Sequence, residues 1–274
     1  MSDPVESHSV TPNQPIGRVS ELGKMPAHWL LAQMGKKVLR PGGIELTHEM
    51  LRALAIGLGD EVVEFAPGLG VTAKLTLRHD PASYVAVERD EVAAARVRSF
   101  LNGSSQRCVV GNAQDTGLPA ESVTVVYGEA MLTMQPPATK DRIVLEAVRL
   151  LRAGGRYGIH ELSLVPDNLP ASLRAEISAA FGTSIHHLVQ PLTQAEWRRL
   201  LENHGMKVQY SRTAPMHLLE PRRVIRDEGH WGAVRFLFNV LRHKEARSRV
   251  LKLKRLFRSY RNNVGAIVLV AVKQ

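Results

Sequence analysis

The sequence predicts an α/β protein built around one mostly parallel sheet that helices cover on both faces. Two observations carry this prediction. Between residues 61 and 165, short β-branched runs alternate with segments of helical periodicity, as in βαβ units. A glycine-rich turn also follows the first of these runs and opens a helix. With 274 residues, 44% of them hydrophobic and 23% charged, the chain suits one large domain or two small ones.

The elements of this core follow from local patterns. Strands are predicted at 61–66, 83–88, 106–110, 122–127 and 156–162, and helices at 72–78, 90–101 and 138–151. Turn residues end each helix: Asp80-Pro81, Asn102-Gly103 and Gly154-Gly155. The alternation of the two patterns predicts five core strands joined by helical crossovers.

The flanking segments are also mostly helical. Helices are expected at 29–39 and 47–58, with Thr47 as the N-cap of the second, and at 169–181 and 193–203. Strands at 206–211 and 265–272 close the fold. We therefore divide the chain into a disordered leader (1–25), an N-terminal helical cap (26–60), the α/β core (61–165), a helical insertion with the last core helix (166–205), and closing strands (206–274) that carry an insert at 221–261.

Composition excludes several classes of protein. Cys108 is the single cysteine, so an intramolecular disulfide and a Cys-rich metal site are excluded, and a cytoplasmic location is the default. The polar N-terminus lacks the features of a secretory signal, and the longest apolar run is well below the ~20 residues of a membrane span. The eleven histidines show no metal-binding spacing, so no metal is expected.

The net charge of +10 belongs to one segment. Residues 221–261 hold thirteen Arg and Lys against three acids, Asp227, Glu228 and Glu245. The rest of the chain has 23 basic and 23 acidic residues and is neutral. The sequence therefore combines a neutral domain with one basic insert.

The strongest motif runs from Glu64 to Gly70 and reads EFAPGLG. Glycines at 68 and 70 would allow a sharp turn and a close approach of the backbone to a ligand. Twenty residues after Gly68, the second strand ends in Glu88, whose carboxylate could accept hydrogen bonds from both ribose hydroxyls. These are the parts of a site for an adenosine-containing cofactor.

Two cofactors fit these residues. Gly68-Leu69-Gly70-Val71-Thr72-Ala73 matches the dinucleotide fingerprint of NAD, with Glu88 as its acid. Three features favour S-adenosylmethionine instead. Glu64 would attract a cationic amino acid and repel a pyrophosphate. Asn112 and Ala113 follow the third strand, where they could contact adenine, and no second βαβαβ half follows the fifth strand.

With these residues the sequence resembles the class I S-adenosylmethionine-dependent methyltransferases, in the group that includes the ubiquinone and menaquinone C-methyltransferases. EFAPGLG, the acid of VAVERD, GNAQDTGLP and LLRAGGRYGI carry the resemblance. It implies a Rossmann-like methyltransferase sheet with an antiparallel final strand, and Glu64, Ala66, Gly68, Gly70, Glu88, Asn112 and Ala113 as the residues that bind S-adenosylmethionine. Ala66 replaces the usual glycine of the first motif, and Asn112 replaces the usual acid of the adenine motif.

The resemblance also indicates where the methyl acceptor would bind, above the ends of the fourth and fifth strands. Glu129 and His160 are the candidates there to take a proton from the acceptor or to orient it. His186 and His187 lie in the insertion where a substrate lid is expected. Each of these four residues has an equally simple structural interpretation, as a strand end, a buried histidine or a pair of loop histidines.

The basic insert is predicted to form two amphipathic helices. Apolar residues recur at the same offsets in each half: Trp231, Val234, Leu237, Phe238 and Leu241, and then Val250, Leu253, Leu256, Phe257 and Tyr260. The stripes could pack on the sheet or cover the active site. Alternatively, the insert could contact an anionic membrane, while the few aromatic residues disfavour nucleic acid.

The sequence thus predicts methyl transfer from S-adenosylmethionine to a small, lipophilic or aromatic acceptor, in a cytoplasmic protein that could contact a membrane peripherally. Two alternatives remain open. One is an NAD-dependent oxidoreductase that uses the same turn. The other is a non-catalytic protein that binds a membrane or RNA through residues 221–261.

Overall fold

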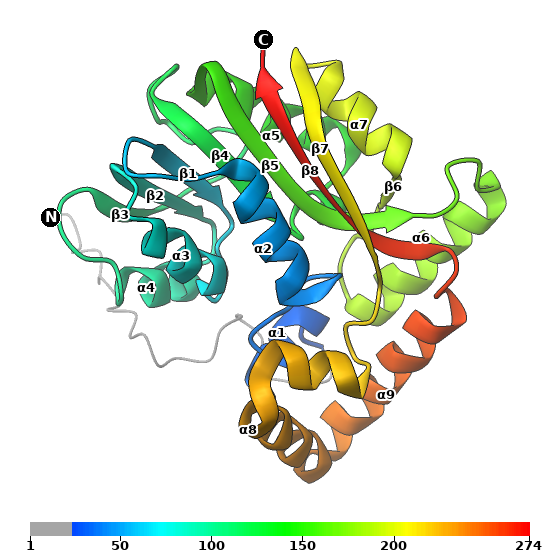
Figure 1. Cartoon of the computed structure of the whole chain (residues 1–274). Coiled ribbons are helices and arrows are strands. Elements are labelled where there is room, and N and C mark those ends of the chain that lie inside the picture. The colour runs from blue at the N-terminus through cyan, green and yellow to red at the C-terminus, as the bar shows by residue number, and fades with distance from the viewer. Residues whose placement is uncertain (1–23) are drawn as a thin grey trace, which may run out of the picture.

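The computed structural model describes residues 24–274, and its strands form one sheet. The strands are β1 (Glu61–Phe65), β2 (Ser83–Glu88), β3 (Gln106–Val110), β4 (Val123–Glu129), β5 (Leu151–Leu164), β6 (Leu192–Thr193), β7 (Met206–Pro215) and β8 (Val264–Lys273). They pair in the order β3-β2-β1-β4-β5-β8-β7, with the short β6 beside β5 (Figure 1). Each predicted strand is present.

The sheet is parallel in its first five strands and mixed at one edge. β1 pairs with β2 and β4 in parallel, β2 with β3, and β4 with β5. β8 runs antiparallel to both β5 and β7. The chain reverses between β1 and β4, so the ends of these two neighbouring strands form the crevice where such sheets bind ligands. The predicted fold class, with an antiparallel final strand, is confirmed.

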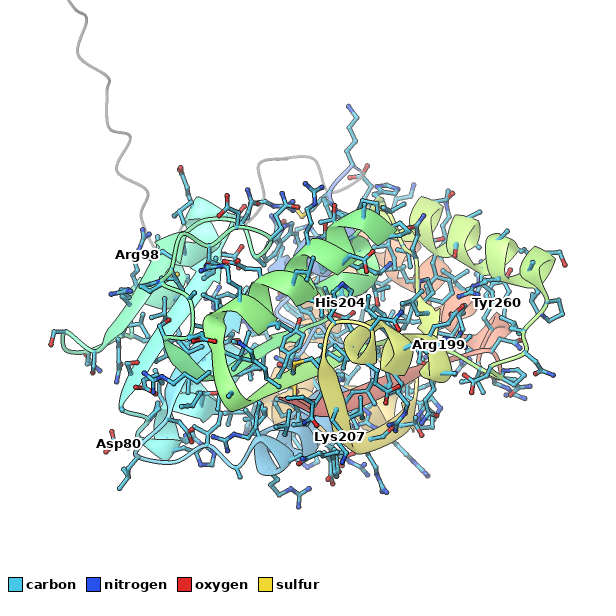
Figure 2. All side chains as sticks on the ribbon, turned by 90° about the horizontal axis from the view of Figure 1, so that it is seen from above. Asp80, Arg98, Arg199, His204, Lys207 and Tyr260 are labelled. Carbon is cyan, nitrogen blue, oxygen red and sulfur yellow. The ribbon has the colours of Figure 1, made fainter. Side chains whose placement is uncertain are left out.

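Helices cover both faces of the sheet. On one face lie α2 (Gly43–Leu54), α3 (Val71–Thr76) with a 3-10 turn η1 (Leu77–His79), and α4 (Glu91–Arg98), which share a buried apolar cluster with β1 and β2. On the other lie α5 (Pro137–Leu150) and α7 (Gln194–Glu202), side by side in Figure 2 with His204 between them. α7 begins with a capping box formed by Thr193 and Glu196.

A third apolar cluster lies beyond the sheet and forms a cap. It joins α1 (Ala27–Gln33), α6 (Ala171–Ile185), α8 (Pro221–Arg242) and α9 (Lys244–Ser259) to the ends of β5 and β8. Figure 1 shows α1, α8 and α9 gathered below the sheet. The cap therefore combines an N-terminal helix with both insertions, although these segments are far apart in the sequence.

Several predicted boundaries differ from those of the structure, and two of the differences are informative. Thr47 does not cap a helix, because α2 begins four residues earlier, and its second amide, that of Ile44, donates to Asp227 Oδ1 of α8 at 3.1 Å. The cap of α2 thus comes from a distant helix, which no local pattern could reveal. The predicted leader, 1–25, lies outside the described residues except for its last two, and Met25 is fully buried in the cap cluster.

The basic insert forms the two predicted helices, joined at His243, but their apolar stripes have different surroundings. The stripe of α9 is largely buried, with Leu253 1% exposed and Phe257 7% exposed. The predicted stripe of α8 instead faces solvent, because the helix buries Phe236 and Val240 from another side. Gly229, at φ 74° and ψ 170°, breaks α8 into two halves.

Candidate active site

A cavity of about 830 Å³ lies between the sheet and the cap. It falls within the range of ligand pockets, roughly 300–1,000 Å³. The predicted cofactor residues along its wall come from the ends of β1, β2 and β3: Glu64, Ala66, Gly68, Glu88, Asn112 and Ala113. Of the predicted cofactor residues, Gly70 is missing from this lining. The parallel sheet brings these segments together because the carboxyl ends of its strands meet at one edge.

The turn after β1 uses left-handed backbone at three positions. Ala66 has φ 52°, Gly68 φ 55° and Gly70 φ 71°. A side chain on Gly68 would meet no described atom within 4 Å, so this glycine leaves open cavity beside the backbone. A Cβ on Gly70 would lie 2.5 Å from Phe100 Cζ, so the close approach of the Phe100 ring, which follows α4, requires glycine at position 70. The two glycines therefore serve different purposes, and Ala66 holds a conformation that alanine adopts at a cost of roughly 1–2 kcal/mol.

Glu88 closes this turn. Its carboxylate accepts hydrogen bonds from the amides of Gly68 at 3.0 Å and Asp90 at 2.9 Å. Burial raises the pKa of Glu88, although hydrogen bonds from the backbone oppose that shift. The side chain is thus held rigidly at the end of β2, beside the glycine turn and along the cavity wall.

Glu64 is a buried carboxyl one residue before the end of β1. Its Oε2 accepts a hydrogen bond from Tyr127 at 2.8 Å and another from Tyr84. Burial raises the pKa of Glu64 to about 7, because the two tyrosine hydrogen bonds only partly offset the loss of solvation. The group is therefore about half ionised at neutral pH and would lose its proton beside a cationic ligand.

A second polar cluster lies where β4 ends. Glu129 accepts hydrogen bonds from Arg40, Thr72, Thr47 and His160, and the contacts of Thr47 and His160 both measure 2.7 Å. Burial alone would raise the pKa of Glu129, but Arg40 and the hydrogen bonds outweigh it and lower the pKa to about 2. Glu129 is thus a fixed negative charge at neutral pH.

His160 lies behind this cluster and does not line the cavity. Its Nδ1 lies 2.7 Å from Glu129 Oε1, and its Nε2 lies 2.6 Å from the carbonyl oxygen of Pro41. Both partners are acceptors, so both ring nitrogens must carry a proton if both contacts are hydrogen bonds. This geometry argues against the predicted role of His160 in taking a proton from an acceptor.

Glu161, which no sequence pattern singled out, anchors the loop that follows β4. Its carboxylate accepts from the amides of Met131 at 2.9 Å, Leu132 at 2.7 Å and Thr133 at 3.0 Å, and from the Thr133 hydroxyl at 2.7 Å. This loop contains the 3-10 turn η2 (Leu132–Met134) and forms part of the cavity wall. A buried carboxylate with four donors is an effective anchor for such a segment.

The far end of the cavity is lined by the cap and is mainly apolar. Its side chains come from α6, α9 and the segment after β7, and they include Phe181, Leu253, Phe257, Met216 and Leu218. His187 also lies there, whereas His186 ends α6 in a left-handed conformation and is exposed. The predicted histidine pair is therefore divided between the cavity and the surface.

His28 of α1 is a further polar group along the cavity wall, and no sequence pattern singled it out. Its ring centroid lies 6.5 Å from that of His187. The buried Nδ1 of His28 has no hydrogen-bond partner among residues 24–274. Burial, with a smaller contribution from His187, lowers the pKa of His28 to about 4, so its ring is neutral at pH 7.

The other residues missed were Arg40 and Glu161. Arg40 lies in the Arg-Pro-Gly-Gly turn that we assigned only to a connection between helices. Glu161 directly follows His160, and the alternation of a strand points the two to opposite faces. The available signal for Glu161 was that it is the one acidic residue of β5.

Comparison with known proteins agrees with this arrangement. Residues 63–159 match the family model described as "Methyltransferase domain", and this range runs from the middle of β1 into the second half of β5. An "Uncharacterized protein" of Haemophilus influenzae is 28% identical over 249 residues, covering 89% of this chain and 96% of that one.

Two solved structures share the fold. Phosphoethanolamine N-methyltransferase 2 of Haemonchus contortus, in complex with S-adenosyl-L-methionine, has a TM-score of 0.68 at 14% identity and covers 90% of this chain and 56% of that chain. A geranyl diphosphate methyltransferase in complex with GPP and sinefungin has a TM-score of 0.60 at 16% identity and covers 84% of this chain and 77% of that chain.

Residues 63–159 therefore match a methyltransferase domain, on a fold that solved S-adenosylmethionine-dependent methyltransferases share. The protein is an S-adenosylmethionine-dependent methyltransferase, and S-adenosylmethionine is its cofactor. The sequence of the glycine turn was compatible with both NAD and S-adenosylmethionine, and the family match selects S-adenosylmethionine.

Proposed function

We propose that the protein transfers a methyl group from S-adenosylmethionine to a small lipophilic or aromatic acceptor that carries a hydroxyl or another polar head. The observation that supports this most directly is the two-part character of the cavity. One part meets the polar strand ends, and the other is enclosed by Phe181, Leu253 and Phe257 of the cap. A dry, apolar compartment beside the cofactor suits an acceptor that leaves water readily.

In this proposal the strand ends hold the cofactor. Gly68 provides open space beside its backbone, and Glu88 accepts hydrogen bonds from the ribose hydroxyls with the lone pairs that its two amide contacts leave free. Asn112 and Ala113 contact the adenine. Glu64 faces the cationic amino group and becomes ionised beside it. These residues fit the cofactor because they combine an anion for its ammonium with acceptors for its sugar.

Held by Glu64, Gly68 and Glu88, the cofactor would supply an electrophilic methyl group on a sulfonium. The methyl carbon would pass to a lone pair of the acceptor, and the electron pair of the broken carbon–sulfur bond would stay on sulfur. The acceptor atom then loses its proton, if it carries one, to solvent or to a nearby base. The chain contributes alignment and exclusion of water.

Glu129 and His160 act in this proposal by position and not by proton transfer. With a pKa of about 2, Glu129 is too weak a base to hold a proton at neutral pH. Hydrogen bonds with Thr47, Thr72 and the His160 ring fix the positions of the charged Glu129 and Arg40 side chains. We infer that this cluster orients the methyl donor along the axis of transfer.

His28 and His187 are the residues that we assign to the acceptor. His28 lines the cavity with a neutral ring, and its buried Nδ1 has no hydrogen-bond partner among residues 24–274. Related folds accommodate different acceptors, since one neighbour was solved with GPP and another is named for phosphoethanolamine. The apolar lining of this cap favours a lipophilic acceptor here.

The test follows radioactive methyl groups from S-adenosylmethionine into an organic-solvent lipid extract and, separately, into the water-soluble extract of the same cells. We expect enzyme-dependent label in the lipid extract. His28→Ala and His187→Ala should slow this labelling, while the neighbouring exposed His186→Ala serves as the matched control and should not. Label found only in water-soluble products would refute the lipophilic acceptor, and equal rates for all three variants would refute the role of the two cavity histidines.

A further inference from the structure

The second half of α8 carries an apolar face that the fold leaves uncovered. This α8 face consists of Trp231, Val234, Leu237, Phe238 and Leu241. Their spacing places all five side chains along one side of the helix. Trp231 is 87% exposed, and the other four are between 54% and 58% exposed. The same half-helix buries Phe236 and Val240 in the cap cluster. Because packing of the cap uses those two residues, the α8 face is not needed to hold the helix in place.

The fold presents this face outward through specific contacts. The first half of α8 is tied down by Asp227, which accepts from the Ile44 amide, and by Glu228, which accepts from the amides of Lys37 and Val38 at 2.9 Å. Gly229 then breaks the helix with a positive φ. In the second half, Asn239 donates to the carbonyl of Met34 at 3.0 Å. The half-helix is thus held from its inner side.

The charges around the α8 face are almost all positive. Arg235, Arg242, Lys244 and Arg247 are exposed, and Arg242 lies 5.2 Å above the ring of Phe238. Two of the three acids of the insert point inward, since the side chains of Asp227 and Glu228 are 0% and 1% exposed and face the buried Lys36. Glu245 remains as the exposed acid of the insert. The outer surface is therefore more cationic than the sequence count suggests.

We propose that the α8 face docks on an anionic membrane surface. Tryptophan, phenylalanine and leucine on one side of a helix, flanked by arginines, match the requirements of a helix that lies in the interface of a bilayer. A symmetric contact with a second copy would bring these cationic flanks together, which disfavours it. Nucleic acid would use the arginines but has no need of Val234, Leu237 and Leu241.

Docking would bring the cap, and not the sheet, to the bilayer. α9 packs against α8, and its Leu253 and Phe257 line the apolar end of the cavity. α1 also contributes to that lining and contacts α8 through Met34. Among the described residues no helix is long and apolar enough to cross a membrane. The proposal is therefore of surface attachment, and it does not depend on which acceptor is methylated.

The experiment measures flotation of the full-length protein with vesicles of phosphatidylcholine alone and of phosphatidylcholine with about 30% phosphatidylglycerol. We expect attachment to the anionic vesicles, weakened at high salt. The triple variant Trp231→Gln/Leu237→Gln/Phe238→Gln should lose it. Reversal of Arg235 and Arg242 to glutamate should lower partitioning by at least about 25-fold, since each neutralised arginine contributes about fivefold.

Two controls separate docking from damage to the fold. Leu58→Gln and Leu145→Gln replace leucines that are 72% and 51% exposed outside the α8 face, and should float like the wild type. The tryptophan fluorescence of the wild-type protein provides a direct measurement of docking. Trp197 is fully buried and Trp29 half-buried, so quenching of fluorescence by brominated lipid should come mainly from Trp231 and disappear in Trp231→Phe, which should still float.

Three results would overturn the proposal. The first is equal flotation of wild type and triple variant, or no quenching by brominated lipid. The second is a dimer in sedimentation that the triple variant dissociates, which would assign the α8 face to a second copy. The third is binding to a short single-stranded RNA that the arginine reversals abolish and the triple variant retains, in a protein that does not float. Cofactor binding, measured separately with S-adenosylhomocysteine, is expected to be the same in every one of these variants.

Discussion

The ionisation of Glu64 gives a prediction whose size can be worked out from the structure. The side chain is 3% exposed, and burial raises its pKa from an ordinary value of 4.5 to about 7. One pKa unit corresponds to about 1.4 kcal/mol, so the ionised carboxylate destabilises the folded state by about 3 kcal/mol relative to an unfolded chain that has the ordinary pKa. This contribution is largest at alkaline pH.

The sign follows from proton binding. Between about pH 4.5 and pH 7 the folded protein holds a proton on Glu64 that the unfolded chain has lost. The contribution of this group to stability is therefore fully present below the unfolded pKa and is lost as the pH rises through the folded pKa. Isosteric Glu64→Gln keeps an oxygen acceptor for Tyr84 and Tyr127 and removes the titration.

The assay is urea denaturation of wild type and Glu64→Gln at about pH 5 and about pH 8.5. The variant should gain about 2–3 kcal/mol relative to the wild type between these two values. Glu202→Gln, which changes an exposed carboxylate, should show no such gain. Parallel stability profiles for wild type and Glu64→Gln would show that Glu64 does not titrate near neutrality, and our account of its environment would be wrong.

Further predictions concern the other parts of the site. Glu88→Ala should weaken the binding of S-adenosylhomocysteine in calorimetry by about 1.5–3 kcal/mol, the range for hydrogen bonds to a charged group, and unchanged affinity would contradict its role at the ribose. Gly70→Ala should lower the free energy of unfolding by about 2–4 kcal/mol, because its Cβ would clash with Phe100 and its φ is positive, and a wild-type melting curve would contradict this. Arg40→Met should cost about 3–5 kcal/mol in denaturation at pH 7, because it removes the arginine partner of the buried Glu129 carboxylate. Without Arg40 the pKa of Glu129 should rise, so acid protonates this carboxyl more readily in the variant. The loss of unfolding free energy should therefore be smaller at low pH. A loss that is independent of pH would show that packing, not charge, is responsible.

Local patterns were sufficient for the sheet and for one wall of the cavity. The strands at 83–88 and 106–110 were predicted with the bounds that the structure has, because each is a short valine-containing run bounded by turn residues. Glu64, Gly68 and Glu88 could be selected because strand ends of a parallel sheet converge by topology alone.

Local patterns could not separate residues that share a motif but differ in surroundings. Gly68 and Gly70 look alike in sequence, yet one leaves space in the cavity and the other leaves space for Phe100. The adjacent His186 and His187 likewise divide between surface and cavity. In both cases the difference is set by which distant atoms lie beside each side chain, and a spacing carries no such information.

By itself, the sequence determined the class of fold, the elements that carry the proposed cofactor residues and the location of the excess charge, since each of these depends on periodicity or composition within one segment. Only the tertiary structure decided which groups face one another: Arg40 with Glu129, Glu161 with the loop after β4, and His28 with His187. It also decided that α9 covers the cavity while the α8 face is left outside. A helix apolar on two sides can bury either one, and the contacts of its distant neighbours make that choice.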